Sequence, residues 1–390
     1  MPDSSQHRGA ITLAVVLVLG AVAARPAQAQ TFTAIHSFDG YDGAYPYASV
    51  IQDEAGNLYG TTLGDNDDNY GVVFKLDAVG HETVLHSFSG GYDGDFPYSP
   101  VIRDSKGNIY GTNLLGQYGS PGTVFKIDSA GNYTTLHTFA GGTSDGCDPY
   151  QGLVMDKAGN LYGTTKGCGT SGMGTVFKVD NAGNETILHN FAGGLSDGAF
   201  PYYGHLLLDE AGDLYGVTYE GGSSKYYGVL YKLSKEGALT VLHSFAGGTS
   251  DGCYPLGTVT IDKTGNLYGN ALECGTSGYG IVWKVSKKGG ETILHNFAGG
   301  TSDGCYPAAG VVRDSKGNLY GNTLSCGASG YYGTVWQLRP KGKLTLLHSF
   351  VERDGAFPYG EVLRTAKGTL YGTTYYGGSY FYGAVWKYKP

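Results

Sequence analysis

Short stretches of alternating hydrophobic and polar residues recur along residues 31–390, separated by turn-forming Gly, Asp and Asn. In one repeat they occupy residues 149–156, 160–165, 174–180 and 185–191, which we name strands A to D. In strand C, Val176 and Lys178 alternate with Phe177 and Val179, which is the two-residue period of a β-strand. No segment of this region shows a sustained 3.6-residue period, so we predict an all-β protein.

The connection from strand A to strand B has the sequence D-K-A-G-N-L-Y-G-T-T at residues 156–165, and close copies begin at residues 53, 104, 209, 262, 314 and 365. Successive copies lie 51 to 53 residues apart, a spacing in the range of propeller blades. Four antiparallel strands in each of seven repeats predict a seven-bladed β-propeller, in which each sheet buries both faces against its neighbours. The alternative is an open β-solenoid, which would need capping repeats that we do not find.

The two ends of the repeat region predict how the ring closes. Residues 31–38 read as a strand D with no A, B or C before it, whereas residues 360–390 supply A, B and C with no D after them. We therefore expect the N-terminal strand to complete the last blade. Such pairing hides the two sheet edges that an open stack would expose.

The six cysteines form three pairs with the same spacing of 21 residues, and the pairs are Cys147 and Cys168, Cys253 and Cys274, and Cys305 and Cys326. In each pair one Cys lies in the D-to-A loop and the other in the B-to-C loop. These loops emerge on the same face of an up-and-down blade, so we predict three disulfides and an oxidising compartment. A zinc site is the alternative, but no paired His recurs beside the cysteines.

The first 29 residues have the features of a secretory signal. His7 and Arg8 precede an apolar run at residues 10–24, and Ala27-Gln28-Ala29 supplies small residues for cleavage. A membrane anchor is the alternative, but the run of 15 residues is shorter than the roughly 20 that a spanning helix needs. We expect residues 30–390 to form a single monomeric domain, secreted or periplasmic, with no membrane span after cleavage.

Composition narrows the possible partners. The chain contains 67 Gly and 33 Tyr among 390 residues, only 15% of its residues are charged, and its net charge is −8. This is typical of a β protein with many tight turns and a large supply of aromatic side chains. The negative charge argues against nucleic acid as a partner.

Several conspicuous residues occur in every repeat, which favours a structural role for them. A His occupies the same strand D position seven times, and an Asp-Gly turn precedes every strand A. We expect each His to be half-buried and hydrogen-bonded, and each motif Tyr to pack between blades. Only the acidic loop from Asp65 to Asp68 resembles a Ca²⁺ loop, and we predict no other metal or cofactor site.

A functional site that is present only once in the ring must use residues that differ from the repeat. In strand A, which we expect to line the central channel, the departures are Arg103, His205, Arg313, Glu361 and Arg364. His205 follows a one-residue insertion, which suggests a bulge. An acid/base pair of His205 and Glu361 would have to span a wide channel, so we assign no catalytic residue.

The face with the D-to-A and B-to-C loops is rich in aromatic residues beside the Pro that opens strand A. Such a weakly charged face suits stacking of a saccharide or a peptide. The candidate ligand-binding residues are Tyr47, Tyr98, Tyr150, Tyr202, His205, Tyr359 and Glu361.

The motifs L-H-S-F, F-x-G-G-x-x-D-G, G-N-L-Y-G-T-T and G-T-V-F-K, taken together, resemble the GloVer tandem repeats of exported bacterial choice-of-anchor proteins. The resemblance covers residues 31–390. It implies an exported repeat protein with no established activity, so it assigns no functional residues. The chain differs in ending at Pro390, directly after the last strand and without an anchor segment, which puts surface attachment in doubt.

The sequence therefore predicts a non-enzymatic binding or scaffold protein whose partner is a glycan or an extracellular or envelope protein. One alternative is a polysaccharide lyase or hydrolase at the channel mouth, although no carboxylate pair stands out from the repeat. The other is a purely structural envelope component.

Overall fold

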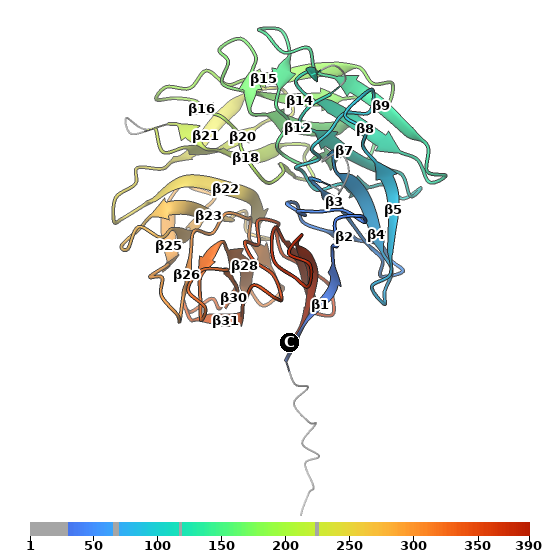
Figure 1. Cartoon of the computed structure of the whole chain (residues 1–390). Helices are drawn as coiled ribbons and strands as arrows, with labels where there is room; N and C mark the ends of the chain where they lie inside the picture. Colours follow the sequence, from blue (N-terminus) through green and yellow to red (C-terminus); the bar gives the residue numbers. More distant parts are fainter. Residues whose placement is uncertain (1–29, 65–69, 117–118, 223–225) are drawn as a thin grey trace, which may run out of the picture.

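A computed structural model describes residues 30–64, 70–116, 119–222 and 226–390, and these residues form seven four-stranded antiparallel sheets arranged in a ring (Figure 1). The predicted signal segment and the acidic loop at residues 65–69 lie outside the described residues. Among the described residues, no helix is long and apolar enough to cross a membrane. The prediction of an all-β, seven-bladed propeller is confirmed.

Each blade runs from an inner strand A to an outer strand D. Strands A are β2 (Ile51–Gln52), β6 (Ile102–Arg103), β11 (Val154–Met155), β17 (Leu207–Leu208), β22 (Gly252–Ile261), β27 (Val312–Arg313) and β32 (Leu363–Arg364). Strands B are β3 (Leu58–Thr62), β7 (Ile109–Asn113), β12 (Leu161–Thr165), β18 (Leu214–Thr218), β23 (Leu267–Cys274), β28 (Leu319–Thr323) and β33 (Leu370–Thr374).

Strands C are β4 (Val72–Leu76), β8 (Thr123–Ile127), β14 (Thr175–Val179), β20 (Val229–Leu233), β24 (Ile281–Val285), β30 (Thr334–Leu338) and β34 (Ala384–Lys389). Strands D of blades 1 to 6 are β5 (Glu82–Ser87), β9 (Tyr133–Thr138), β15 (Glu185–Asn190), β21 (Leu239–Ser244), β25 (Glu291–Asn296) and β31 (Leu344–Ser349), and β1 (Thr31–Ser37) is strand D of blade 7. Three two-stranded ribbons extend the loops: β10 (Gly146–Cys147) with β13 (Gly167–Cys168), β16 (Gly198–Ala199) with β19 (Glu220–Gly221), and β26 (Gly304–Cys305) with β29 (Ser325–Cys326).

The repeated turn motif stabilises the A–B hairpin through its Asp. In blade 3, the Asp156 carboxylate accepts hydrogen bonds from the backbone N–H of Asn160 at 2.9 Å, its side-chain amide at 2.7 Å and the Tyr162 hydroxyl at 3.0 Å. Gly159 has a φ of +87°, a value that favours glycine. The motif thus fixes the turn and anchors the Tyr that packs between blades.

Each pair of neighbouring blades encloses its own hydrophobic cluster. Between blades 1 and 2, Tyr59 and Val73 of one blade pack with Val101, Ile109 and Phe125 of the next. The Gly after each motif Tyr leaves room for the strand C aromatic ring, since a Cβ on Gly60 would lie 2.6 Å from a ring carbon of Phe74. The predicted packing of the motif Tyr between blades is confirmed.

The ring closes as predicted. β1 pairs antiparallel with β34, with Thr31 opposite Lys389 and Ser37 opposite Ala384. Figure 1 shows this blue N-terminal strand beside the red strands of the last blade. Phe38, directly after β1, is fully buried.

The three disulfides join the predicted cysteine pairs, with Cα–Cα distances of 5.3 to 5.4 Å. In blades 3 and 6 they link the two strands of a loop ribbon, and in blade 5 they link the extended ends of β22 and β23. Each closes a loop of 21 residues, for which the chain-entropy model gives about 3 kcal/mol. Blades 3, 5 and 6 are therefore braced on the same face of the ring.

Six of the seven inner strands are shorter than the sequence pattern predicts, with two residues each, whereas β22 of blade 5 has ten. The stretch predicted at residues 149–156 forms a strand only at Val154–Met155. The preceding residues make other bonds: Tyr150 N–H donates to Asp148 O at 2.9 Å, and Gly152 N–H donates to Gly204 O of blade 4 at 2.8 Å. These residues face the channel and link neighbouring blades.

Candidate functional site

The mouth of the channel is built by the same local turn in all seven blades. The residue before the Pro of each D-to-A loop has a positive φ between 53° and 61°, which is uncommon for a residue other than Gly. The Pro then packs on the Gly that precedes strand C of the previous blade, as Pro97 does on Gly71. Because every blade has this turn, the backbone conformation is part of the architecture.

The residue after that Pro distinguishes the blades. It is Tyr in blades 7, 1, 2, 3 and 4, but Leu256 in blade 5 and Ala308 in blade 6. Five blades therefore send a tyrosine to the mouth, and two send an aliphatic residue. The five are the predicted candidates, Tyr359, Tyr47, Tyr98, Tyr150 and Tyr202.

The structure places these five tyrosines in one larger network, which we call the tyrosine belt. Successive rings are in contact, with centroid separations of 4.5 to 6.2 Å from Tyr227 at one end to Tyr375 at the other. All belt members are half-buried, so each also has surface open to solvent. The belt consists of Tyr45, Tyr47, Tyr98, Tyr150, Tyr202, Tyr203, Tyr219, Tyr227, Tyr254, Tyr359 and Tyr375.

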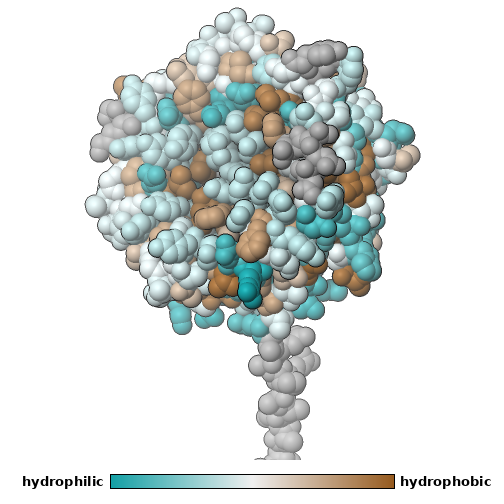
Figure 2. Space-filling view, viewed as in Figure 1, coloured by the Kyte–Doolittle hydropathy of each residue, from teal (hydrophilic) through white to brown (hydrophobic). Residues whose placement is uncertain are grey.

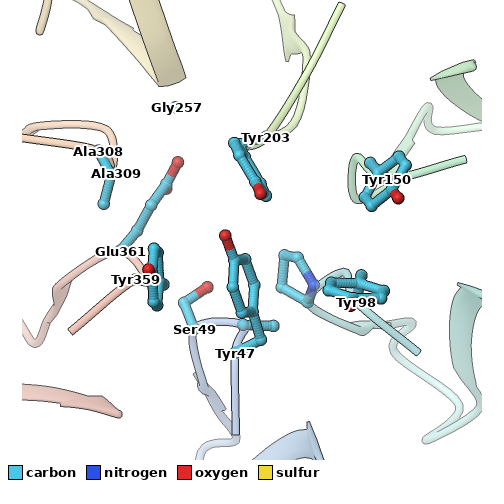
Figure 3. A pocket seen from close by; sticks show the side chains of 14 residues that line it. Tyr47, Ser49, Tyr98, Tyr150, Tyr203, Gly257, Ala308, Ala309, Tyr359 and Glu361 are labelled. Carbon is cyan, nitrogen blue, oxygen red and sulfur yellow. The ribbon is translucent and has the colours of Figure 1, made fainter. Parts of the chain in front are cut away.

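The centre of the belt closes the channel. Tyr47 stacks on Tyr359 at 4.5 Å and on Tyr203 at 5.3 Å, and Figure 3 shows Tyr47 and Tyr203 pointing toward each other from opposite sides. Burial raises the pKa of both tyrosines well above the usual value, so both hydroxyls stay protonated. The cavity that these rings line has a volume of about 30 Å³, which has room for water but is far below the roughly 300 Å³ of a small-molecule pocket.

Charged side chains lie along the belt. The Lys166 ammonium lies 5.1 Å from the ring centroid of Tyr150 and 4.4 Å from that of Tyr202, which are cation–π distances. At the other end of the belt, the pKa of both Tyr219 and Tyr254 is raised. Burial is the main cause, followed by the nearby charges of other belt tyrosines and of Glu220 and Glu273. The belt thus offers aromatic faces, hydroxyls, one cation and two carboxylates.

The sequence prediction missed Lys166, Tyr219 and Tyr375, although a signal for them was present. All three lie four residues after the motif Tyr, at a position that is Leu in the other four blades. The three blades that break the Leu pattern thus contribute these three side chains to the mouth. A comparison of repeats at this position would have found them.

His205 and Glu361 are closer than the sequence suggested, because Thr258 joins them. The Thr258 hydroxyl lies 2.9 Å from both the His205 backbone nitrogen and its Nδ1, and the Thr258 N–H donates to Glu361 Oε1 at 2.7 Å. Glu361 reaches past Ala309 toward Gly257 (Figure 3). His205 lines a different cavity, together with Arg103 and Met155. The network joins blades 4, 5 and 7 where their inner strands line the channel, and we call this level of the channel the waist.

The expectation that Arg103, Arg313 and Arg364 face the channel needs correction. Their guanidinium carbons lie 5.2 to 5.5 Å from the ring centroid of the motif Tyr in the preceding blade. Cation–π contact with these rings holds the guanidinium groups between blades.

Four of the repeated His residues hydrogen-bond the Asp of the following turn through Nε2, as predicted, at 3.0 to 3.2 Å, and His36 Nε2 lies 2.8 Å from Asp42 Oδ2. At two other blade junctions a Glu lies beside the His and the Asp. His137 Nε2 lies 3.6 Å from Asp145 Oδ2 and 3.8 Å from Glu185 Oε2, and His243, Asp251 and Glu291 repeat the arrangement. Each of the two clusters brings three potential metal-ligand atoms within 4.8 Å of one another.

Replacing Glu185 by Leu is expected to stabilise the protein at pH 8 but not at pH 5. Burial, followed by the charge of Asp145, raises the pKa of Glu185 to about 7. A carboxyl whose pKa is raised on folding stabilises the fold at low pH, and that contribution is lost as the pH rises toward 7. Leu has no charge, so it removes the free-energy cost of burying the ionised Glu185 carboxylate. Blades 4 and 6 have Leu at the equivalent positions 239 and 344.

The gain should be on the order of 1 kcal/mol at pH 8. Urea denaturation of both proteins at the two pH values measures it, with EDTA present so that no cation masks the carboxylate. Glu236→Leu, at an exposed turn position, serves as the control. An equal change at both pH values for Glu185→Leu would contradict the prediction.

The closed ring places the protein in the class of seven-bladed β-propellers built from one tandem repeat. The family model described as the Gloeobacter/Verrucomicrobia repeat matches residues 20–226 and 202–390, so the chain belongs to that repeat family. This confirms the resemblance that the sequence motifs indicated. No curated protein matched the sequence.

Solved structures share the fold at low sequence identity. The extracellular domain assigned to a one-component system of B. thetaiotaomicron has a TM-score of 0.56 and 10% identity, covering 88% of this chain and 38% of that one. The corresponding domain of a hybrid two-component system from the same bacterium gives 0.56 and 13%, covering 93% and 41%. This chain therefore spans less than half of either. A gluconolactonase from Xanthomonas campestris gives 0.44 and 14%, covering 88% and 96%, and we infer no activity from it.

Proposed function

We propose that the protein is an exported, non-enzymatic binding protein that holds a saccharide on the tyrosine belt. The observation that carries the proposal is the unbroken series of ring contacts across the mouth. Half-buried tyrosines held by their neighbours present flat apolar faces at little cost in side-chain entropy. The apolar C–H face of a sugar ring can stack on such a surface.

The polar groups of the belt suit a neutral saccharide. Tyrosine hydroxyls donate and accept hydrogen bonds, Glu220 and Glu273 accept them, and Lys166 donates them. The net charge of −8 opposes long polyanions. Hydrophobic residues on the face in Figure 2 form separate patches rather than one apolar surface of the kind that a protein partner usually covers.

The three disulfides support export, because they persist in oxidising compartments. The proposal therefore places the protein in the periplasm or outside the cell, after removal of the predicted signal segment. The waist does not favour catalysis: Glu361 Oε1 is hydrogen-bonded to a backbone N–H, and His205 lines another cavity. Binding without turnover agrees better with these contacts.

Glycan-array screening followed by titration calorimetry tests the proposal. We expect a neutral oligosaccharide to bind, and we expect Tyr150→Ala and Tyr202→Ala each to weaken it about three- to tenfold, the size of a lost aromatic contact. Tyr331→Ala, an exposed tyrosine outside the belt, is the control and should not change the affinity.

Three results would count against this function. Absence of any saccharide ligand for the folded protein would remove its main support. Full affinity in both belt variants would place the ligand elsewhere. Shortened products after incubation with the bound saccharide would instead show a polysaccharide-acting enzyme.

A further inference from the structure

We propose that the groove between blades 5 and 6, on the face that carries the A–B and C–D turns, binds an anionic sugar through its carboxylate or phosphate group. We call this the basic groove. It has a volume of about 300 Å³ and is lined by Lys284, Arg313, Lys316 and Arg339, with Tyr268 and Leu294. It lies on the opposite face from the tyrosine belt and does not depend on saccharide binding there.

Different elements bring the four cations together. Lys284 is on β24 and Arg313 is on β27, whereas Lys316 and Arg339 are in the A–B and C–D turns of blade 6. No carboxylate is among the described residues that line the groove. None of the four forms an ion pair with any residue that the structure describes. Their charge is therefore available to a ligand.

Arg313 is the most constrained of the four. Its guanidinium carbon lies 5.5 Å from the ring centroid of Tyr268, whose hydroxyl is held by Asp262 at 2.9 Å. Its Nε is buried and has no hydrogen-bond partner. A buried N–H of this kind is costly unless a ligand or water satisfies it. A guanidinium fixed in this way is suited to bidentate contact with a carboxylate or phosphate.

Two equivalent grooves elsewhere in the ring contain carboxylates beside their lysines. The groove between blades 3 and 4 is lined by Asp156, Asp209 and Glu210 as well as Lys157 and Lys235. The groove between blades 2 and 3 likewise contains carboxylates. The groove between blades 5 and 6 differs from these two in having cations without a carboxylate among its described lining residues.

The residue at position 339 shows this departure from the repeat most directly. Blades 1, 2 and 3 have Asp77, Asp128 and Asp180 there, and each carboxylate accepts backbone N–H groups that fix the C–D turn. Blade 6 has Arg339, followed by Pro340. The turn thus loses a capping carboxylate, and the groove exchanges a negative charge for a positive one.

The size and the walls of the groove indicate the ligand. A volume of about 300 Å³ is at the lower end of the range for small-molecule pockets. Tyr268, Leu294 and Leu319 add apolar surface to the cations, which suits a compact ring carrying one acidic group. The net charge of −8 opposes a long polyanion such as nucleic acid beyond the groove.

Titration calorimetry of the whole protein with glucuronate, glucose 6-phosphate, inorganic phosphate, glucose and a short single-stranded DNA tests the proposal. Glucuronate or glucose 6-phosphate is expected to bind, and glucose is not. Binding should weaken from 50 to 200 mM NaCl, because salt screens partly exposed charges.

The double variant Arg313→Met, Arg339→Asp should weaken the charged sugar at least about tenfold. It uses the residues found at these positions in blade 3, Met155 and Asp180, so folding should be preserved, and circular dichroism checks it. Lys157→Ala, in the groove between blades 3 and 4, is the matched control and should bind normally.

The proposal is overturned if neither charged sugar binds, if glucose binds equally well, or if the folded double variant keeps full affinity. Inorganic phosphate binding as tightly as glucose 6-phosphate, with no glucuronate binding, would overturn the assignment to a sugar. Tighter binding of DNA than of both charged sugars would overturn it in favour of nucleic acid. Loss of binding in the belt variants alone would place the ligand on the other face.

Discussion

A chain that lacks residues 31–38 should lose cooperative folding, whereas a circular permutant that carries the same residues after Pro390 should keep it. Deletion removes β1 from β34 along its whole length and removes Phe38, which packs against Phe74 at 5.1 Å. Loss of one buried Phe side chain alone costs about 3 to 5 kcal/mol, against a typical total stability of about 5 to 15 kcal/mol.

The permutant is feasible because Thr31 lies opposite Lys389. A turn like residues 339–343 of blade 6 can join the two strands. Blade 7 would then be one continuous A-to-D meander like the other six. Thermal unfolding followed by near-ultraviolet circular dichroism distinguishes the two variants. A deletion variant that melts like the parent protein would show that β1 does not hold the ring closed.

The second large effect is expected at the waist of the channel, where Gly257→Ala should destabilise the protein by about 3 kcal/mol or more. Gly257 has a φ of +80°, and a Cβ there would lie 2.1 Å from the backbone nitrogen of Gly310 in the next blade. Backbone atoms cannot move aside as a flexible side chain can. The neighbouring inner strands would have to separate, which would also disturb the Thr258–Glu361 bond.

Gly248→Ala provides the matched control, because it isolates the cost of the positive φ. Gly248 has a φ of +78°, and a Cβ there would meet no atom within 4 Å. Its substitution should cost only the backbone strain, about 1 kcal/mol. Urea denaturation of the two variants gives the difference. Equal losses would mean that the inner strands can separate freely.

The sequence predicted the features that depend on the order of repeats. Seven copies of the turn motif give the number of blades, the incomplete first and last repeats give the closure by β1, and the spacing of 21 residues gives the disulfides. Each of these follows from counting along the chain. None of them requires knowledge of how far one blade is twisted against the next.

Other features that were missed depend on contacts between blades and have no signal in a comparison of repeats. Glu185 begins an outer strand, yet it contacts His137 of the preceding blade, because the twisted sheet brings the C–D turn at Gly183 against the backbone of Leu136. The proximity of His205 and Glu361 likewise depends on how closely Gly257 and Gly310 let the inner strands approach. A repeat period gives the position of a residue around the ring but not these separations.

The centre of the tyrosine belt closes the channel, and this determines how a long ligand can contact the protein. Because the rings of Tyr47 and Tyr203 stack on each other across the channel at 5.3 Å, a polymer cannot be threaded through the channel and must lie across the mouth. Contact of that kind needs no free chain end. One long polysaccharide could then carry many copies of the protein along its length, and occupancy would scale with polymer mass rather than with the number of chain ends.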